Sequence, residues 1–159
     1  MIKMLISKKE LQIVCEFRQN ARENLTRASR KLHIPVSTIY DRLKKYQGNL
    51  IIKHTAILDF KKLGFNIKVM MAFKSLKINR QEVIKFLHSH HRVNSIYRVS
   101  NNSDFMIEVI FKDLKELNNF TEKLETYTVK DIQQYYVVED LKKEEFLTTP
   151  ESIELLADC

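Results

Sequence analysis

A group of hydroxyl, phenol, carboxylate and cationic side chains between residues 36 and 46 is the part of the sequence best suited to binding chemistry. Ile39, Leu43 and Tyr46 recur at i, i+4, i+7, which predicts the buried stripe of a helix. The polar side chains off that stripe are Ser37, Thr38, Tyr40, Asp41, Arg42, Lys44 and Lys45. Hydroxyls near the start of a helix and cations towards its end are typical of a helix in a DNA major groove. A solvated helix face is the plainer interpretation.

A second helix, which must position the first, is predicted just before it, over residues 24–32. The apolar residues of its stripe are Leu25, Ala28 and Leu32. Asn24 can cap its first turn with its side-chain oxygen. The cations off the stripe, which are candidates for contacts with phosphates, are Arg27, Arg30 and Lys31. Residues 33–35 form the corner between the helices, where His33 is among the few non-Gly residues that tolerate a left-handed backbone.

A third helix and a wing complete the predicted unit. Residues 8–17 carry apolar residues at helical spacing, and Gly48 and Asn49 end the helix that contains Ile39. Residues 50–58 mix β-branched and polar residues, which predicts a wing hairpin and an exit strand, with Lys53 as a further DNA-contact candidate. The expected shared core is Ile13, Phe17, Leu25, Leu32, Ile39 and Leu43. Together these elements predict a winged helix-turn-helix.

The positive charge of the chain is concentrated in this N-terminal part. Residues 1–64 contain 14 Lys+Arg and 5 Asp+Glu, a net charge of +9, whereas residues 65–159 contain 13 and 15, a net charge of −2. A polyanion such as double-stranded DNA would bind the basic part by neutralisation of its phosphates, with an affinity that falls steeply with salt. A basic surface without a ligand is the alternative.

The apolar period changes after residues 59–64. Alternation predicts strands and helical spacing predicts helices in the order strand 67–73, helix 83–87, strand 93–100, strand 105–111, helix 114–124 and strand 129–138. This order is the split βαβ or ferredoxin-like arrangement, an antiparallel sheet with both helices on one face. The expected fold class is therefore α+β.

The predicted division of the chain has four parts. They are a winged helix-turn-helix at residues 1–50, a wing or linker strand at 51–64, a ferredoxin-like domain at 65–143 and a C-terminal tail at 144–159. For the tail, two predictions stay open: a short helix or strand at an assembly interface, or a frayed end.

Both alternating sets of residues along the predicted strands are apolar or aromatic. Met70 and Ala72 alternate with Val69 and Met71, and the later strands repeat this pattern. A wholly solvated face would alternate with polar residues, so we predict a homodimer built sheet to sheet. A single sheet of ordinary amphipathic strands is the alternative.

Other functions are disfavoured by what the sequence contains. No apolar run is long enough to span a membrane, and a signal peptide is not expected, so we predict a cytoplasmic protein without membrane contact. Cys15 and Cys159 have no metal-site or disulfide spacing, and are expected to be a buried side chain and a free thiol. His88, His90 and His91 favour a polar helix end over zinc. We expect neither a metal nor a cofactor.

With these residues in view, the chain resembles the Lrp/AsnC family of transcription regulators from Leu11 to about Lys143. The segments that carry the resemblance are a first helix ending at Arg22, the run STIYDRL at residues 37–43, the junction AILDFKKLG at 56–64 and the corner VSNNSD at 99–104. The family has a winged helix-turn-helix followed by a ligand-sensing ferredoxin-like domain. Individually these motifs are weak, but their order and spacing are fairly specific.

Three positions depart from the family pattern. Family members usually have Gly at the helix-turn-helix corner, Ser as the cap of the recognition helix and Gly at the start of the sensing loop, where this chain has His33, Pro35 and Asn101. The resemblance implies that the effector site, an amino-acid site in the family, includes Asn101, Asn102, Ser103 and Asp104. Asn101 adds a side chain to that loop, so a different effector, or none, is an open alternative.

The resemblance further implies a non-enzymatic, sequence-specific DNA-binding regulator. Its dimer would present two recognition helices to a roughly palindromic operator and would assemble further, up to an octamer. Two alternatives from other classes stay open. One is a siroheme decarboxylase-like enzyme on the same two-domain framework, which the basic N-terminal part argues against. The other is a metabolite-binding module without DNA binding.

Overall fold

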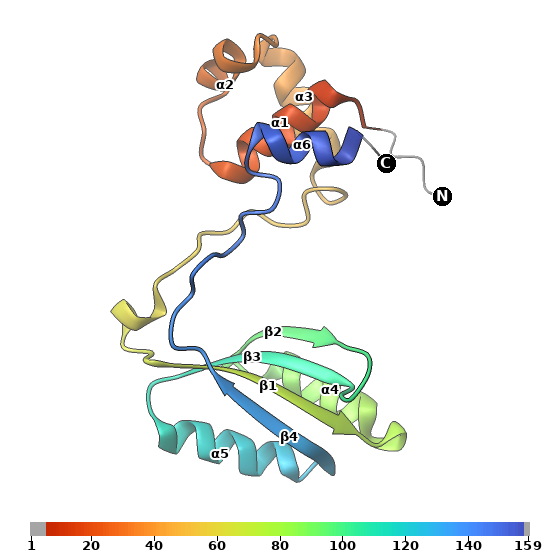
Figure 1. Ribbon diagram of the computed structural model, residues 1–159, viewed down its shortest axis with the longest axis vertical. Coiled ribbons are helices and arrows are strands. Elements are labelled where there is room, and N and C mark those ends of the chain that lie inside the picture. Colours follow the sequence, from red (N-terminus) through yellow and green to blue (C-terminus); the bar gives the residue numbers. More distant parts are fainter. Residues whose placement is uncertain (1–5, 158–159) are drawn as a thin grey trace. The chain divides into compact units, whose positions relative to one another are not determined.

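The computed structural model describes residues 6–157, which fold into two compact units (Figure 1). The first unit contains the chain up to Ile57 and from Lys142 onward, and the second runs from Leu58 to Leu141. No helix among the described residues is both long and apolar enough to cross a membrane.

Three helices form the core of the first unit: α1 (Lys8–Gln19), α2 (Leu25–Leu32) and α3 (Val36–Tyr46). α1 begins with a capping box, in which Ser7 and Glu10 satisfy each other's backbone N–H groups. The Asn24 side chain accepts from the Thr26 N–H at 2.8 Å, which confirms the predicted cap of α2. The apolar residues packed together are Ile13, Phe17, Leu25, Ala28, Leu32, Ile34, Ile39 and Leu43. This cluster contains every residue of the predicted core.

The corner between α2 and α3 has the predicted geometry. His33 adopts a left-handed backbone with φ 53° and ψ 41°, the conformation for which a corner usually has glycine. Pro35 precedes α3 and provides no side-chain hydrogen bond to its first turn. The backbone of this turn is therefore the one expected of a helix-turn-helix corner, although His33 and Pro35 stand where Gly and Ser are usual.

The predicted wing is wrong for the described residues 50–58, which form no β-ladder. Their one bridging residue, Ile51, belongs to an isolated parallel bridge with Gln47. A hairpin needs two strands that pair over several residues, and Ile52, Ile57 and Leu58 are exposed, so no packing holds this segment extended against a partner. Of the predicted linker strand, residues 60–63 form instead a short 3-10 helix, η1 (Phe60–Leu63), which ends at Gly64 with φ 84°.

The C-terminal segment belongs to the first unit and ends in a helix, α6 (Pro150–Ala157), which packs beside α1 (Figure 1). Ile153 is buried against Leu11 and Cys15. The Arg18 guanidinium, at the end of α1, donates to the Phe146 carbonyl and forms an ion pair with Glu144 at 2.9 Å. The tail therefore supplies a fourth helix to this unit. Cys159 lies outside the described residues.

The second unit has the predicted order of strands and helices. Its elements are β1 (Ile67–Ser75), η2 (Lys77–Asn79), α4 (Arg80–Ser89), β2 (Val93–Arg98), β3 (Phe105–Phe111), α5 (Leu114–Glu125) and β4 (Val129–Tyr136). The sheet order is β2-β3-β1-β4 with antiparallel neighbours, and both helices cover one face (Figure 1). Under the helices, Val69, Met71 and Phe73 of β1 pack with apolar residues of β3, α4 and α5. The ferredoxin-like prediction is confirmed.

The opposite face of the sheet mixes apolar and polar side chains. Its apolar members are Met70, Ala72, Tyr97, Met106, Ile110 and Tyr135, as the strand register places them. Ala72 and Ile110 are buried within the unit, whereas Tyr97 and Tyr135 are half exposed. Lys74 on this face pairs with Asp131 at 2.7 Å. Apolar residues therefore do occur on both faces, as predicted, but polar residues separate them on this one.

Replacing Ile153 with Ala should destabilise the first unit, because it removes the apolar side chain by which α6 is buried on Leu11 and Cys15. We expect a loss of about 2 kcal/mol, the lower end for a buried Ile→Ala change, since α6 lies at the edge of the core. Urea unfolding followed by helical circular dichroism measures it. Glu154→Ala, an exposed change on the same helix, is the control, and equal midpoints for both variants would contradict the packing role of α6.

Candidate nucleic-acid interface

The exposed face of α3 carries most of the side chains that the sequence assigned to DNA. They are Ser37, Thr38, Tyr40, Asp41, Lys44 and Lys45, all of which are exposed. The face is fixed by the opposite stripe, on which Ile39 and Tyr46 are buried and Leu43 is half-buried. With 3.6 residues per turn, these three residues leave Ser37, Asp41 and Lys44 pointing away from α1 and α2.

Arg42 differs from its neighbours because it is already paired within the unit. Its Nη1 lies 2.9 Å from Oε1 of Glu10 on α1, and only about two fifths of its side chain is exposed. Glu10 Oε2 also accepts the Ser7 N–H at 2.8 Å. Arg42 thus links α3 to α1. That Arg42 contacts DNA stays a prediction.

The pKa values of this cluster reflect the same contacts. The Ser7 backbone N–H, together with hydrogen bonds from Tyr46 and Ser7 and the charge of Arg42, lowers the pKa of Glu10 to about 2. Burial, followed by the hydrogen bond to Glu10, raises the pKa of Tyr46 to about 12. At neutral pH the cluster therefore contains a carboxylate, a guanidinium and a neutral phenol. Sequence reasoning missed Glu10, although the S-x-x-E pattern of residues 7–10 marks a capping box.

The remaining predicted cations fall into two groups. Lys31 pairs with Glu16 at 2.7 Å, and Arg27 lies 3.7 Å from Glu23, so part of their charge is neutralised within the unit. Within residues 6–157, no ion pair involves Arg30, Lys44, Lys45 or Lys53. This second group can neutralise phosphates without first breaking an internal ion pair.

The C-terminal segment lowers the charge of the unit that it joins. Residues 1–57 contain 12 Lys+Arg and 4 Asp+Glu, whereas residues 142–159 contain 2 and 5. The net charge of the unit falls from +8 to +5 when the segment is included. Since the tail packs beside α1, its carboxylates offset part of the positive charge of the same unit.

The predicted effector corner follows β2, at residues 101–104. Asn101 has φ 72°, a left-handed backbone, at the place where the family usually has glycine. The Asp104 carboxylate accepts from Arg80 Nη2 at 2.7 Å and from the Ser75 N–H at 3.0 Å. Arg80 Nε is buried and has no hydrogen-bond partner among the described residues. Sequence reasoning missed Arg80 and Ser75, for which no local signal exists.

The histidines after α4 pack against aromatic rings. The ring of His90 lies against Phe120, at a centroid distance of 4.8 Å, and is stacked on His91. Burial is the main cause that lowers the pKa of His90. The described residues contain no group of His, Cys, Asp or Glu side chains arranged to hold a metal ion.

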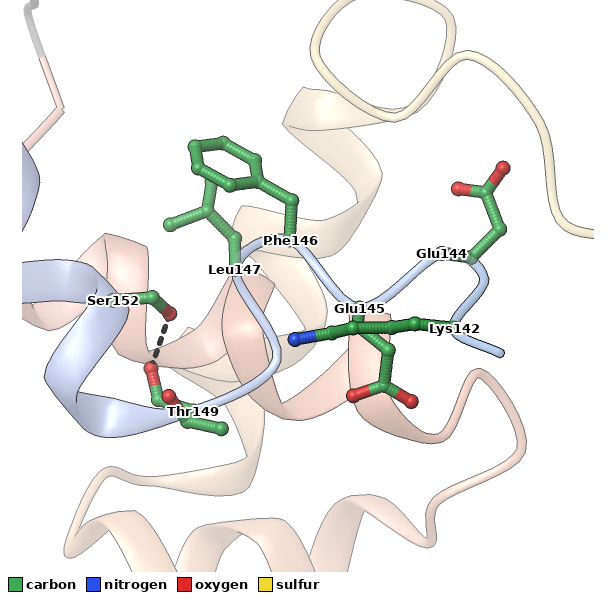
Figure 2. Close-up of a pocket in the computed structure, with 7 residues that line it drawn as sticks. All are labelled: Lys142, Glu144, Glu145, Phe146, Leu147, Thr149 and Ser152. Atoms are coloured by element: carbon green, nitrogen blue, oxygen red, sulfur yellow. Dashed lines mark hydrogen bonds between the residues drawn. The ribbon is translucent and has the colours of Figure 1, made fainter. Parts of the chain in front are cut away.

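A shallow hollow lies along the C-terminal segment (Figure 2). It is lined by Lys142, Glu144, Glu145, Phe146, Leu147, Thr149 and Ser152. Ser152 Oγ donates to the Thr149 carbonyl at 2.5 Å, which closes the first turn of α6. The lining mixes both signs of charge without convergent polar groups, so we assign it no ligand.

Comparison with known proteins agrees with this geometry. Residues 69–146 match the family model described as the Lrp/AsnC ligand binding domain. The chain is 25% identical to the HTH-type transcriptional regulator LrpB of Bacillus subtilis, over 88% of this chain and 93% of that protein. It is 22% identical to an uncharacterised HTH-type transcriptional regulator of Pyrococcus abyssi, over 92% of this chain and all of the relative.

The fold is also that of a solved structure. A transcriptional regulator of Neisseria meningitidis, determined as a complex with L-Met, aligns with a TM-score of 0.80 and 17% identity, over 87% of this chain and 93% of that one. A helix-turn-helix unit with an exposed polar recognition helix, joined to a ferredoxin-like unit, defines a class of DNA-binding transcriptional regulators. Within that class, residues 69–146 match the ligand binding domain of the Lrp/AsnC family, and over most of its length the chain is similar to HTH-type transcriptional regulators.

Replacing Glu10 with Gln should change how the first unit responds to acid. The pKa of Glu10 is about 2 in the folded chain and ordinarily 4.5, so its carboxylate contributes stability above about pH 4.5 that is lost as the pH falls towards 2. We expect the urea midpoint of the wild type to fall more than that of Glu10→Gln across this window, as followed by circular dichroism. Glu122→Gln, on an exposed position of the second unit, is the control. Parallel pH profiles for wild type and Glu10→Gln would contradict the assignment.

Proposed function

We propose that the chain regulates transcription by inserting α3 into the major groove of a specific operator. The observation that supports this most is the position of Ser37, Tyr40 and Asp41 on the exposed first turns of a helix whose other face is buried. Base edges are read from the first turns of such a helix, and phosphates are held by cations around it. The protein would act in the cytoplasm and without catalysis.

The side chains divide by the part of DNA that they suit. Ser37, Thr38, Tyr40 and Asp41 are the proposed readers of base edges. Lys44, Lys45, Arg30 and Lys53 are the proposed phosphate contacts, since no carboxylate within residues 6–157 pairs with them. Arg27, Lys31 and Arg42 contribute less, because an internal carboxylate already holds each of them.

We further propose a homodimer that forms through the sheet face opposite α4 and α5. A second copy would bury the half-exposed Tyr97 and Tyr135 of that face, which the unit itself leaves uncovered. Two recognition helices related by a two-fold axis would then meet a roughly palindromic operator. Octamer formation is the extension that the family resemblance implies.

The corner at residues 101–104 is the proposed effector site. The match to a ligand binding domain and the L-Met complex of the Neisseria protein support an amino acid as the first effector to test. In this chain the Asp104 carboxylate already holds Arg80, so the ammonium group of an effector would have to compete with a guanidinium. A weak or absent amino-acid response is therefore part of the proposal.

The test of this function is selection of bound fragments from the source genome by the full-length protein, with and without an amino-acid pool. We expect a few enriched fragments that share a roughly palindromic motif. Enrichment without any common motif, or no duplex binding, would overturn the proposal. An unchanged fragment set in the presence of the pool would remove amino acids as effectors and leave DNA binding intact.

Salt dependence separates the lysines of α3 from Arg42. Replacing both Lys44 and Lys45 with Ala should weaken binding to all duplexes alike and reduce the slope of log K against log salt by about 0.9 for each phosphate that is no longer neutralised. Arg42→Ala should weaken binding with little change in slope, because Arg42 acts mainly through Glu10.

Titration of labelled duplex at several salt concentrations measures these slopes. The double variant Lys85→Ala/Lys115→Ala, at exposed positions of α4 and α5, removes the same charge and should leave the slope unchanged. A slope unchanged by the double lysine variant would remove those residues from the interface.

A further inference from the structure

The first two turns of α3, at the described residues 36–41, expose no cation. Their exposed residues are Val36, Ser37, Thr38, Tyr40 and Asp41, while Ile39 is buried. The positively charged residues of the helix begin at Arg42, which Glu10 holds, and continue with Lys44 and Lys45 in the last turn. The part of the helix from which bases are read therefore offers hydroxyls, a phenol, a carboxylate and an aliphatic side chain.

This set of groups limits the bases that it can recognise. In the major groove, guanine presents two acceptors, N7 and O6, and is most often read by Arg or Lys. An ionised carboxylate is an acceptor only, so Asp41 would face those atoms unfavourably. It can accept instead from the N4 amino group of cytosine or the N6 amino group of adenine.

Val36 is the aliphatic member of the set. It lies three residues before the buried Ile39, at the edge of the apolar face of the helix, and 39% of it is exposed. It begins the helix and lies one turn before Tyr40, which is 54% exposed. The one apolar group that B-DNA displays in its major groove is the C5-methyl of thymine. A branched aliphatic side chain on the reading turns matches that methyl.

We propose that α3 recognises thymine methyl groups through Val36 and an amino-bearing base, cytosine or adenine, through Asp41. It consequently selects against guanine on the strand that Asp41 contacts. This inference rests on the proposed function, since it specifies the operator that the same helix binds.

The test compares thymine with deoxyuridine, which differs only by the methyl group. The full-length protein is first used to select a preferred duplex from a random library. Each thymine of the half-site is then replaced singly by deoxyuridine, and the affinities of wild type and Val36→Ala are measured. Lys45→Ala is the matched control, since a phosphate contact carries no information about the methyl.

We expect at least one thymine at which loss of the methyl weakens wild-type binding by roughly fourfold, the size of one buried methylene-sized contact. Val36→Ala should bind the thymine and deoxyuridine duplexes there equally, whereas Lys45→Ala should keep the wild-type ratio. In the same library, Asp41→Asn should admit guanine at a position where the wild type excludes it, because an amide can donate as well as accept.

Two results would overturn the inference while leaving the proposed function in place. One is a bound half-site at which every deoxyuridine substitution is neutral for the wild type. The other is a half-site whose most selective position is a guanine that Asp41→Asn leaves unchanged. Failure to bind any duplex would instead refute the proposed function itself, so the two failures are distinguishable.

Discussion

Burial of Ile39 between α1 and α2 is the constraint on which the functional surface depends. Ile39 is fully buried with Ala28 and Ile13, so one side of α3 is committed to the core. The helical period of 3.6 residues per turn then fixes which side chains of α3 point outward. Because the corner at His33 sets how α2 meets α3, its left-handed backbone is part of the same constraint.

The positive charge that the first unit offers to a polyanion depends on its internal ion pairs as well as on its number of cations. Glu10, Glu16 and Glu23 each lie beside a cation on the helices, which leaves a smaller set of cations available to a polyanion. Glu10 has the most contacts, since it caps α1 and pairs with α3 at once. The acidic C-terminal segment packs beside α1, so the net charge of residues 1–57 alone overstates the positive charge of the unit. The useful quantity is the number of unpaired cations near the recognition helix.

Local patterns predicted most of the fold, and contacts between distant residues explain what they missed. Helical spacing, caps and strand alternation are properties of neighbouring residues, which is why α2, α3 and the order of the second unit were predictable. The pair between Glu10 and Arg42, and that between Arg80 and Asp104, join residues far apart in sequence, so no spacing rule reveals them.

The prediction of a wing was wrong for a related reason. β-branched residues favour a strand only where a partner strand is present, and residues 50–58 have none within the described part of the chain. Helix α6 was one of several open outcomes for the tail, because its burial depends on Leu11 and Cys15 of α1.

The central claim is that the exposed face of α3 binds duplex DNA. Hydrogen exchange of the full-length protein, measured with and without a selected duplex, tests it directly, because amides at an interface exchange more slowly when it is occupied. We expect slower exchange in peptides that cover α3 and unchanged exchange in peptides that cover β3 within the sheet core. Duplex binding that leaves α3 exchange unchanged would contradict the claim.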